Sequence, residues 1–136
     1  MNDEVKKEIN DSGVMTIMLN RPKSLNSLNY GLVTGVIEAF EEAASNEGVR
    51  SIILTGEGRG FCSGADLSGG GWPTKPEWTS GQISANNMEL FLNPMIKKIV
   101  ACPKPVINAI NGIAAGGGVG LALSGDILIA AQSAKC

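Results

Sequence analysis

Two short turns rich in glycine and alanine are the segments of this sequence best suited to chemistry. The first is Gly60-Phe61-Cys62-Ser63-Gly64-Ala65-Asp66-Leu67, and the second is Asn111-Gly112-Ile113-Ala114-Ala115-Gly116-Gly117-Gly118-Val119-Gly120. Small side chains let a ligand approach the backbone closely, and amides at a helix start carry partial positive charge. If the two turns face each other, one N–H group from each could bind a single oxygen atom, which is the arrangement of an oxyanion hole.

Other uses of glycine-rich turns have to be weighed. A single turn of this kind also serves tight packing, and neither turn alone excludes that interpretation. A phosphate-binding P-loop is not indicated, because Gly118-Val119 stands where that motif needs Lys followed by Ser or Thr. A dinucleotide-binding turn is only weakly indicated, because Leu121 stands where its last glycine should be.

The sequence contains no histidine. This absence excludes Ser-His-Asp and Cys-His catalysis, and every histidine-ligated metal site, from within this chain. The three cysteines, Cys62, Cys102 and Cys136, share no CxxC spacing, so we predict buried free thiols and neither disulfides nor zinc. Catalysis would therefore depend on carboxylates, backbone amides or residues of another chain, and no cofactor is expected.

Composition limits the class of protein. The 136 residues are 43% hydrophobic and 18% charged, which is typical of one globular domain with a core. A net charge of −2 argues against a nucleic-acid-binding domain. The N-terminus lacks the apolar segment of a signal peptide, and no apolar run reaches the ~18 residues of a membrane-spanning helix. We expect a soluble, cytoplasmic protein that binds neither nucleic acid nor membrane.

Apolar runs predict strands at residues 14–19, 51–55, 106–110 and 126–131. The second and third are nearly all apolar, which is typical of strands buried on both faces of a parallel sheet. Apolar spacing from Leu28 to Ala44 predicts a helix with one buried face, capped by Ser27 or Asn29. Alternating strands and helices predict an α/β fold.

The remaining segments are less regular. A helical pattern at residues 88–99 contains Pro94, which predicts a kink or a restart. A short helix at 119–123 should follow the second turn. Residues 68–81 are rich in glycine and proline and carry Trp72 and Trp78, so we predict a flexible surface loop.

Four motifs together resemble the crotonase (enoyl-CoA hydratase/isomerase) superfamily. They occur in the order and approximate spacing of that family, at residues 20–26 (NRPKSLN), 60–67 (GFCSGADL), 103–107 (PKPVI) and 111–118 (NGIAAGGG). The match covers nearly the whole chain, and known members are longer. The resemblance implies that residues 1–136 are the N-terminal part of a crotonase-like domain, a spiral of ββα units truncated before the C-terminal helical region.

The resemblance also implies a binding site for an acyl-CoA thioester. The oxyanion-hole amides would be those of Ala65 and Gly117. The segment Lys23-Ser24-Leu25 would lie along the CoA, with Arg21 or Lys23 near its phosphates unless these charges are plain surface residues. The other implied substrate-binding positions are Ser63, Asp66 and Leu67 on the adenine and pantetheine path, Ile113 in the acyl pocket, Gly116 and Gly120. Asp66 could also cap a helix after the first turn.

The family chemistry polarises the thioester carbonyl group, so that the α-proton becomes acidic and charge moves to oxygen as an enolate. A carboxylate then moves the proton. The first catalytic glutamate of hydratases would fall at Gly120, which has no side chain, and the downstream acids would lie beyond Cys136. Water addition by two glutamates is therefore not expected, and the resemblance favours an enoyl-CoA isomerase.

Within the family, residues 90–95 and 122–135 resemble the branch of epoxyphenylacetyl-CoA isomerases of phenylacetate degradation. Two alternatives stay open: an enoyl-CoA hydratase of the same fold, and a truncated chain that binds acyl-CoA without turnover. Family members assemble as homotrimers or hexamers through C-terminal helices. Without such helices, we expect the apolar face of the helix from Leu28 to Ala44 to be partly uncovered.

Overall fold

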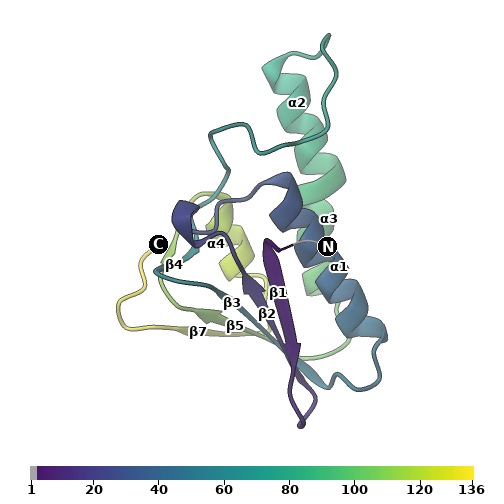
Figure 1. Ribbon diagram of the computed structural model, residues 1–136, viewed down its shortest axis with the longest axis vertical. Helices are drawn as coiled ribbons and strands as arrows, with labels where there is room; N and C mark the ends of the chain where they lie inside the picture. Colours follow the sequence, from purple (N-terminus) through teal and green to yellow (C-terminus); the bar gives the residue numbers. More distant parts are fainter. Residues whose placement is uncertain (1–2) are drawn as a thin grey trace.

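The computed structural model describes residues 3–136 and confirms the α/β class (Figure 1). A five-stranded sheet has the order β1-β2-β3-β5-β7. Strands β1 and β2 form an antiparallel pair, whereas β2, β3, β5 and β7 are parallel neighbours. The strands are β1 (Val5–Ile9), β2 (Val14–Leu19), β3 (Ser51–Gly56), β5 (Val106–Ile110) and β7 (Ile127–Ala130).

A second, two-stranded parallel sheet joins β4 (Gly60–Cys62) to β6 (Ile113–Ala114). These strands follow β3 and β5 along the chain, so the small sheet lies beyond the carboxyl ends of two neighbouring parallel strands (Figure 1). The sequence patterns did not predict β1, β4 or β6. A single 3-10 turn, η1 (Pro22–Ser24), follows β2.

Helices α1 (Tyr30–Ser45) and α3 (Asn93–Val100) pack on one face of the large sheet (Figure 1). Asn29 is the N-cap of α1, and its side chain accepts a hydrogen bond from the amide of Leu32 at 2.8 Å. The helix begins two residues after Leu28, because Leu28 pairs with the first glycine-rich turn instead. At the other end, Lys104 Nζ donates to the carbonyl oxygens of Ala43 and Asn46, both at 2.6 Å.

A nearly continuous helical rod runs from α2 (Ser80–Asn87) through the π-helix η2 (Met88–Leu92) into α3, and its upper part projects beyond the sheet (Figure 1). Pro94 lies in the first turn of α3, which confirms the predicted restart. Thr79 and Gln82 form a capping box at the start of α2. Regular structure therefore begins at residue 80, inside the segment predicted as a loop.

The loop before α2 is anchored by aromatic contacts. The ring of Trp72 lies 6.0 Å from that of Tyr30 and 5.6 Å from that of Phe91, and the rings of Tyr30 and Phe91 are 5.2 Å apart. Trp78 lies under the ammonium group of Lys75 at 5.6 Å. Trp72 is thus packed between α1 and η2, and the flexibility of residues 68–81 stays a prediction.

The core lies on one face of the sheet only. Along β3, Ile52 and Leu54 are buried while Ile53 is half-buried, so the prediction that this strand is buried on both faces is wrong. The physical reason is that both long helices cover the same face. The same alternation holds for β5, residues 106–110.

The predicted uncovering of the first helix is also wrong. Its apolar face is buried against the sheet, with Val36 and Ala39 fully covered. One group of exposed apolar side chains lies instead on the edge strand β7, where Ile127 is 53% and Ile129 is 59% exposed. Within residues 3–136, no helix combines the length and apolar character needed to cross a bilayer.

Candidate functional site

The two glycine-rich turns meet at the end of the small sheet. Because β4 and β6 run parallel, with Cys62 paired to Ala114, both turns leave the sheet in the same direction. The amide of Ala115 donates to the carbonyl oxygen of Cys62 at 3.0 Å. A Cβ atom on Gly64 would lie 2.8 Å from the carbonyl oxygen of Ala115 and 3.5 Å from the amide nitrogen of Gly117. The turns are thus in contact, and the contact requires glycine at position 64.

The amide of Ala65 is free because of how its neighbours pair. Leu28 and Ala65 form a parallel β-bridge, in which the amide of Leu28 donates to Gly64 at 2.7 Å and the amide of Asp66 donates to Leu28 at 3.0 Å. Both bonds use the neighbours of Ala65, so the N–H group of Ala65 points away from Leu28. Within residues 3–136 this N–H group donates to no acceptor, and Ala65 is exposed.

The amide of Gly117 is free for a different reason. Gly117 is the first residue of α4 (Gly117–Ala122), and the first amides of a helix have no intrahelical acceptor. The next two amides, of Gly118 and Val119, bond to Ala115 and Gly116, whereas that of Gly117 donates to nothing in the described chain. The helix begins two residues earlier than predicted, which places Gly117 at its start. Two exposed, unpaired amides therefore lie on adjoining turns.

The segment before α1 runs alongside the first turn. Ser63 donates its amide to the carbonyl oxygen of Leu25 and its hydroxyl group to that of Ser24, both at 2.9 Å. Leu25 has a φ of 54°, in the left-handed region. The structure thus brings Ser24 and Leu25 beside Ser63 and Ala65, although the two pairs lie far apart in the sequence.

Arg21 is held by several contacts within the fold. Its guanidinium bonds to Asp66 Oδ2 at 2.9 Å, to Glu4 Oε2 at 2.9 Å, and to the carbonyl oxygen and hydroxyl group of Ser27, both at 2.8 Å. These contacts fix the partly exposed side chain against its neighbours, and its position relative to the CoA phosphates stays a prediction. Lys23 is exposed and makes no hydrogen bond or ion pair with residues 3–136.

The prediction that Asp66 caps a helix is wrong, because the next helix along the chain, α2, begins at Ser80 and is capped by Thr79. Its Oδ1 atom accepts hydrogen bonds from the hydroxyl group of Ser68 at 2.6 Å and from the amide of Ser68 at 2.8 Å. These bonds to Ser68, and then the guanidinium of Arg21, hold the pKa of Asp66 below its ordinary value. The carboxylate is therefore ionised at neutral pH, which makes it a poor general acid.

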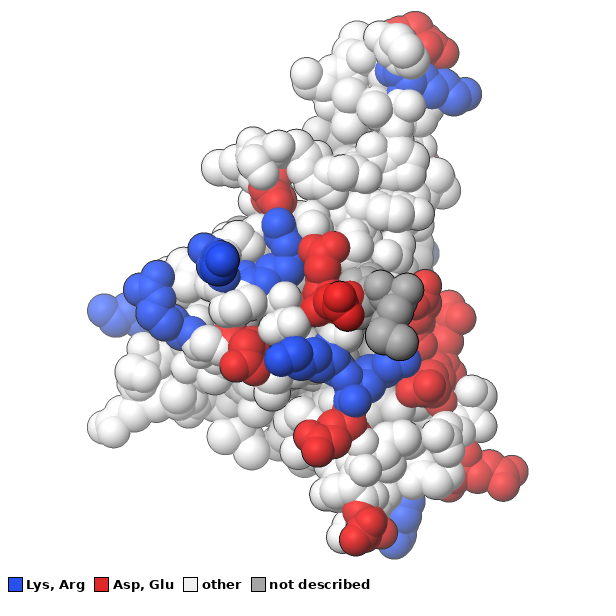
Figure 2. Space-filling view, in the orientation of Figure 1, with Lys and Arg blue, Asp and Glu red and all other residues white. Residues whose placement is uncertain are grey.

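The remaining predicted positions are open to solvent. Leu67 is 97% and Ile113 is 39% exposed, and Gly116 lies in a turn with a φ of 53°. Gly120 is exposed on α4, and a Cβ atom there would meet open space. Figure 2 shows Lys and Arg side chains gathered on the side of the molecule where η1, β4 and the C-terminus lie in Figure 1.

The cysteines are free thiols, but only Cys62 is buried; Cys102 is half-buried and Cys136 is exposed, so the prediction of buried thiols is right for Cys62 alone. Burial raises the pKa of Cys62 to about 11, which keeps its thiol neutral. Among residues 3–136, no three His, Cys, Asp or Glu side chains are grouped so as to hold a metal ion.

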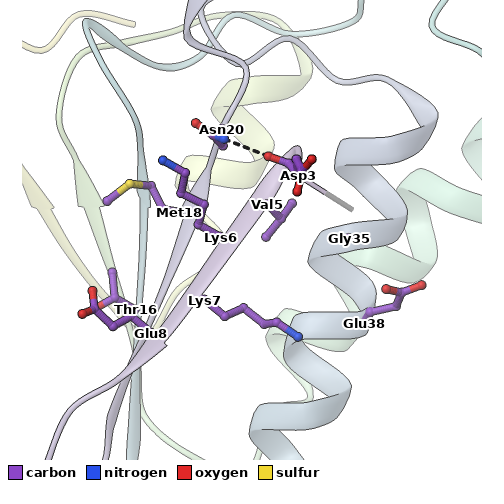
Figure 3. Close-up of a pocket in the computed structure, with 10 residues that line it drawn as sticks. All are labelled: Asp3, Val5, Lys6, Lys7, Glu8, Thr16, Met18, Asn20, Gly35 and Glu38. Atoms are coloured by element: carbon purple, nitrogen blue, oxygen red, sulfur yellow. Dashed lines mark hydrogen bonds between the residues drawn. The ribbon is translucent and has the colours of Figure 1, made fainter. Parts of the chain in front are cut away.

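A surface hollow of about 880 Å³ lies elsewhere, along β1, β2 and α1 (Figure 3). Its lining mixes both signs of charge, since it includes Lys6, Lys7, Glu8 and Glu38, and it includes neither free amide. At one end, Asn20 Nδ2 donates to the carbonyl oxygen of Asp3 at 2.8 Å (Figure 3). This hollow is therefore not part of the candidate site.

The sequence patterns did not identify two residues of the site. Asn26 and Asn111 both belong to motifs named above, yet no role was assigned to their side chains. Both donate hydrogen bonds to the carbonyl oxygen of Gly60, at 3.0 and 3.2 Å. An asparagine beside a glycine-rich turn is the one sequence signal that could have indicated this role.

Comparison with known proteins gives consistent matches to one family. Residues 9–136 match the family model described as enoyl-CoA hydratase/isomerase. The chain is 45% identical over 126 residues to the 1,2-epoxyphenylacetyl-CoA isomerase of Escherichia coli K12, covering 92% of this chain and 47% of that protein. It is 39% identical over 134 residues to the probable enoyl-CoA hydratase of Rhodobacter capsulatus, covering 96% and 47%.

Solved structures show the same likeness. The enoyl-CoA hydratase of Bacillus anthracis matches with a TM-score of 0.83 and 32% identity, covering 97% of this chain and 49% of that one. The chain spans about half the length of the relatives it matches. The likeness confirms the crotonase-type fold expected from the motifs.

Proposed function

Since the chain belongs to the enoyl-CoA hydratase/isomerase (crotonase) family, we propose that the amides of Ala65 and Gly117 bind the thioester oxygen of an acyl-CoA and stabilise its enolate. One observation carries the proposal: these two N–H groups are exposed and unpaired on turns that touch. Backbone N–H groups fixed by neighbouring hydrogen bonds need no rearrangement as charge develops on the oxygen. Losing one such donor typically raises the barrier by about 2.7–4 kcal/mol.

The path of the CoA would follow the segment beside the first turn. Ser24, Leu25 and Ser63 form one hydrogen-bonded surface there, and the exposed side chain of Leu67 can contact the pantetheine arm. Of the two basic residues expected near the phosphates, Lys23 is the one left exposed. Ile113 and Gly116, on the second turn, would face the acyl group.

The reaction that we propose is isomerisation. Proton transfer needs a carboxylate, and position 120, where hydratases of this family carry their first glutamate, is a glycine facing open space. Asp66 is held ionised by Ser68 and Arg21. We therefore propose that the proton is moved by an acid that does not belong to either glycine-rich turn. The relative named 1,2-epoxyphenylacetyl-CoA isomerase supports an aromatic acyl group.

Hydration is the second candidate, because a relative of similar coverage is named an enoyl-CoA hydratase. We also propose assembly as a homotrimer or hexamer, because exposed apolar side chains of β7 would gain from burial against further protein. No cofactor is needed for either reaction, since the CoA is part of the substrate.

Incubating the protein with enoyl-CoA and epoxyacyl-CoA thioesters tests the reaction. Mass spectrometry separates the outcomes, since isomerisation leaves the mass unchanged and hydration adds one water. We expect a product of unchanged mass with a shifted double bond or ring. Binding measured by calorimetry without turnover would leave the amide pair as a thioester-binding site and contradict the isomerase. Absence of binding would contradict the proposal as a whole.

A further inference from the structure

The carbonyl oxygen of Gly60 is a point where three segments meet. It accepts the side-chain amide of Asn26 at 3.0 Å and that of Asn111 at 3.2 Å. A carbonyl oxygen has two lone pairs, and here each has a side-chain donor. Gly60 is the first residue of β4, so this oxygen lies at the base of the turn that carries Ala65.

Asn111 connects the second turn to the first. Its backbone opens the second turn, and its Nδ2 atom donates to Gly58 at 3.0 Å as well as to Gly60. Its Oδ1 atom accepts the amide of Gly56 at 3.0 Å, at the end of β3. One side chain thus fixes the start of the turn that carries Gly117 against the start of the turn that carries Ala65.

Asn26 connects the segment before α1 to the same point. Its side chain is fully buried, donates to Glu57 at 3.1 Å besides Gly60, and accepts the amide of Arg21 at 2.7 Å. Leu25 and Asn26 both have left-handed φ values, of 54° and 56°. Such backbone persists only where its surroundings hold it, and the three bonds of Asn26 do so. Two residues later, Leu28 forms the bridge that turns the amide of Ala65 outward.

We propose that Asn26 and Asn111 are positioning residues, which act through the Gly60 carbonyl oxygen to hold the Ala65 and Gly117 amides at a common oxygen. The inference rests on the proposed function of those amides. Neither asparagine needs to touch the substrate. Close packing reinforces the arrangement, because a Cβ atom on Gly56 would lie 2.6 Å from the Gly60 oxygen and 2.8 Å from Asn26 Nδ2.

The test replaces each asparagine by aspartate in the full chain. Asn111→Asp and Asn26→Asp keep the oxygen that accepts a backbone amide and lose the N–H groups that reach Gly60. Two ligands are titrated by calorimetry: an acyl-CoA thioester and the matching thioether, which lacks the carbonyl oxygen. Any added repulsion from the new carboxylate affects both ligands alike, so the ratio of their dissociation constants reports on the amide pair alone.

We expect the unaltered chain to prefer the thioester by about tenfold, the effect of two hydrogen bonds of ordinary strength. Infrared spectra of a thioester labelled at its carbonyl carbon should show the bound C=O band at lower wavenumber than the free band. In both aspartate variants the preference should fall below about threefold, and the band shift should halve or vanish. A merely structural role would lower stability and leave the ratio and the band unchanged.

Lys104→Met is the matched control. It also removes two hydrogen bonds to main-chain oxygens, of Ala43 and Asn46, but at the opposite end of α1. It should unfold at a lower temperature and keep the full thioester preference. Asn111 is only half-buried, so its aspartate variant is the one best able to fold. If it does not fold, Asn111→Gln takes its place, because the longer arm displaces the donor and should also lower the preference.

Retention of both the preference and the band shift in a folded Asn111 variant would overturn the inference. So would an equal loss in Lys104→Met, since that result would reflect general destabilisation. If the unaltered chain itself binds thioester and thioether equally, the proposed function fails, independently of the asparagines.

Discussion

Leu28 and Ala65 form a parallel β-bridge, and through it a residue two positions before α1 fixes the direction of a backbone amide 37 positions further along the chain. The bridge occupies the amide of Asp66 and the carbonyl oxygen of Gly64. It leaves the N–H group of Ala65 unpaired, at the place where the second turn approaches. The candidate site is therefore built mainly from backbone, and side chains act by holding that backbone.

Gly64→Ala should disrupt the contact between the turns. Gly64 has a φ of 99°, and a Cβ atom would lie 2.8 Å from the carbonyl oxygen of Ala115. We expect a loss of about 2–4 kcal/mol in the free energy of unfolding, combining left-handed strain with overpacking, and loss of the thioester preference. Gly69→Ala is the control, since Gly69 has a φ of 114° with nothing within 4 Å. It should show the strain alone, and equal effects in the two variants would contradict the packing argument.

Two glycines of α4 should respond oppositely to alanine. A Cβ atom on Gly118 would collide with the carbonyl oxygen of Cys62, whereas one on Gly120 meets open space. Denaturant unfolding should show Gly118→Ala destabilised by about 1–3 kcal/mol and Gly120→Ala stabilised by about 0.5–1 kcal/mol, because alanine loses less backbone entropy in a helix. A stabilised Gly118→Ala would show that α4 does not pack on β4 as described.

The Asp66 carboxylate should make the free energy of unfolding depend on pH in the acid range. Its pKa is lowered by Ser68 and Arg21 in the folded state, so its contribution is full above the unfolded pKa of about 3.9. That contribution is lost as the pH falls through the folded pKa. In Asp66→Asn this part of the acid dependence should disappear. Urea unfolding at a series of pH values, from neutral to the lowest pH at which the protein folds, measures this contribution. If the free energy of unfolding falls equally with pH in the unaltered protein and in Asp66→Asn, the role given to Asp66 is contradicted.

Four of the five strands of the large sheet could be predicted from the sequence, because their signal is local. Apolar runs marked β2, β3, β5 and β7, and the apolar spacing with Asn29 as cap marked α1 to within two residues. Burial was misjudged because a run such as Ser51–Gly56 does not reveal that both long helices lie on one face.

Only part of the candidate site could be predicted from the sequence. The positions of the free amides came from motifs, but the strands that align them, Gly60–Cys62 and Ile113–Ala114, are too short to show a period. Side-chain contacts could not be predicted where the partners are distant in sequence. Arg21 reaches Asp66 across 45 positions, so nothing near either residue shows that their charges are already paired. The hydrogen bonds of Asn111 to Gly56 and Gly60 are hidden for the same reason.

The most direct measurement follows the amide proton and nitrogen resonances of Ala65 and Gly117 by NMR while an acyl-CoA thioester is added, with the matching thioether as reference. If both N–H groups bind the thioester oxygen, both proton resonances should move downfield with the thioester and stay in place with the thioether. If neither responds, or if both ligands shift them equally, the two amides do not share the oxygen and the central claim is contradicted.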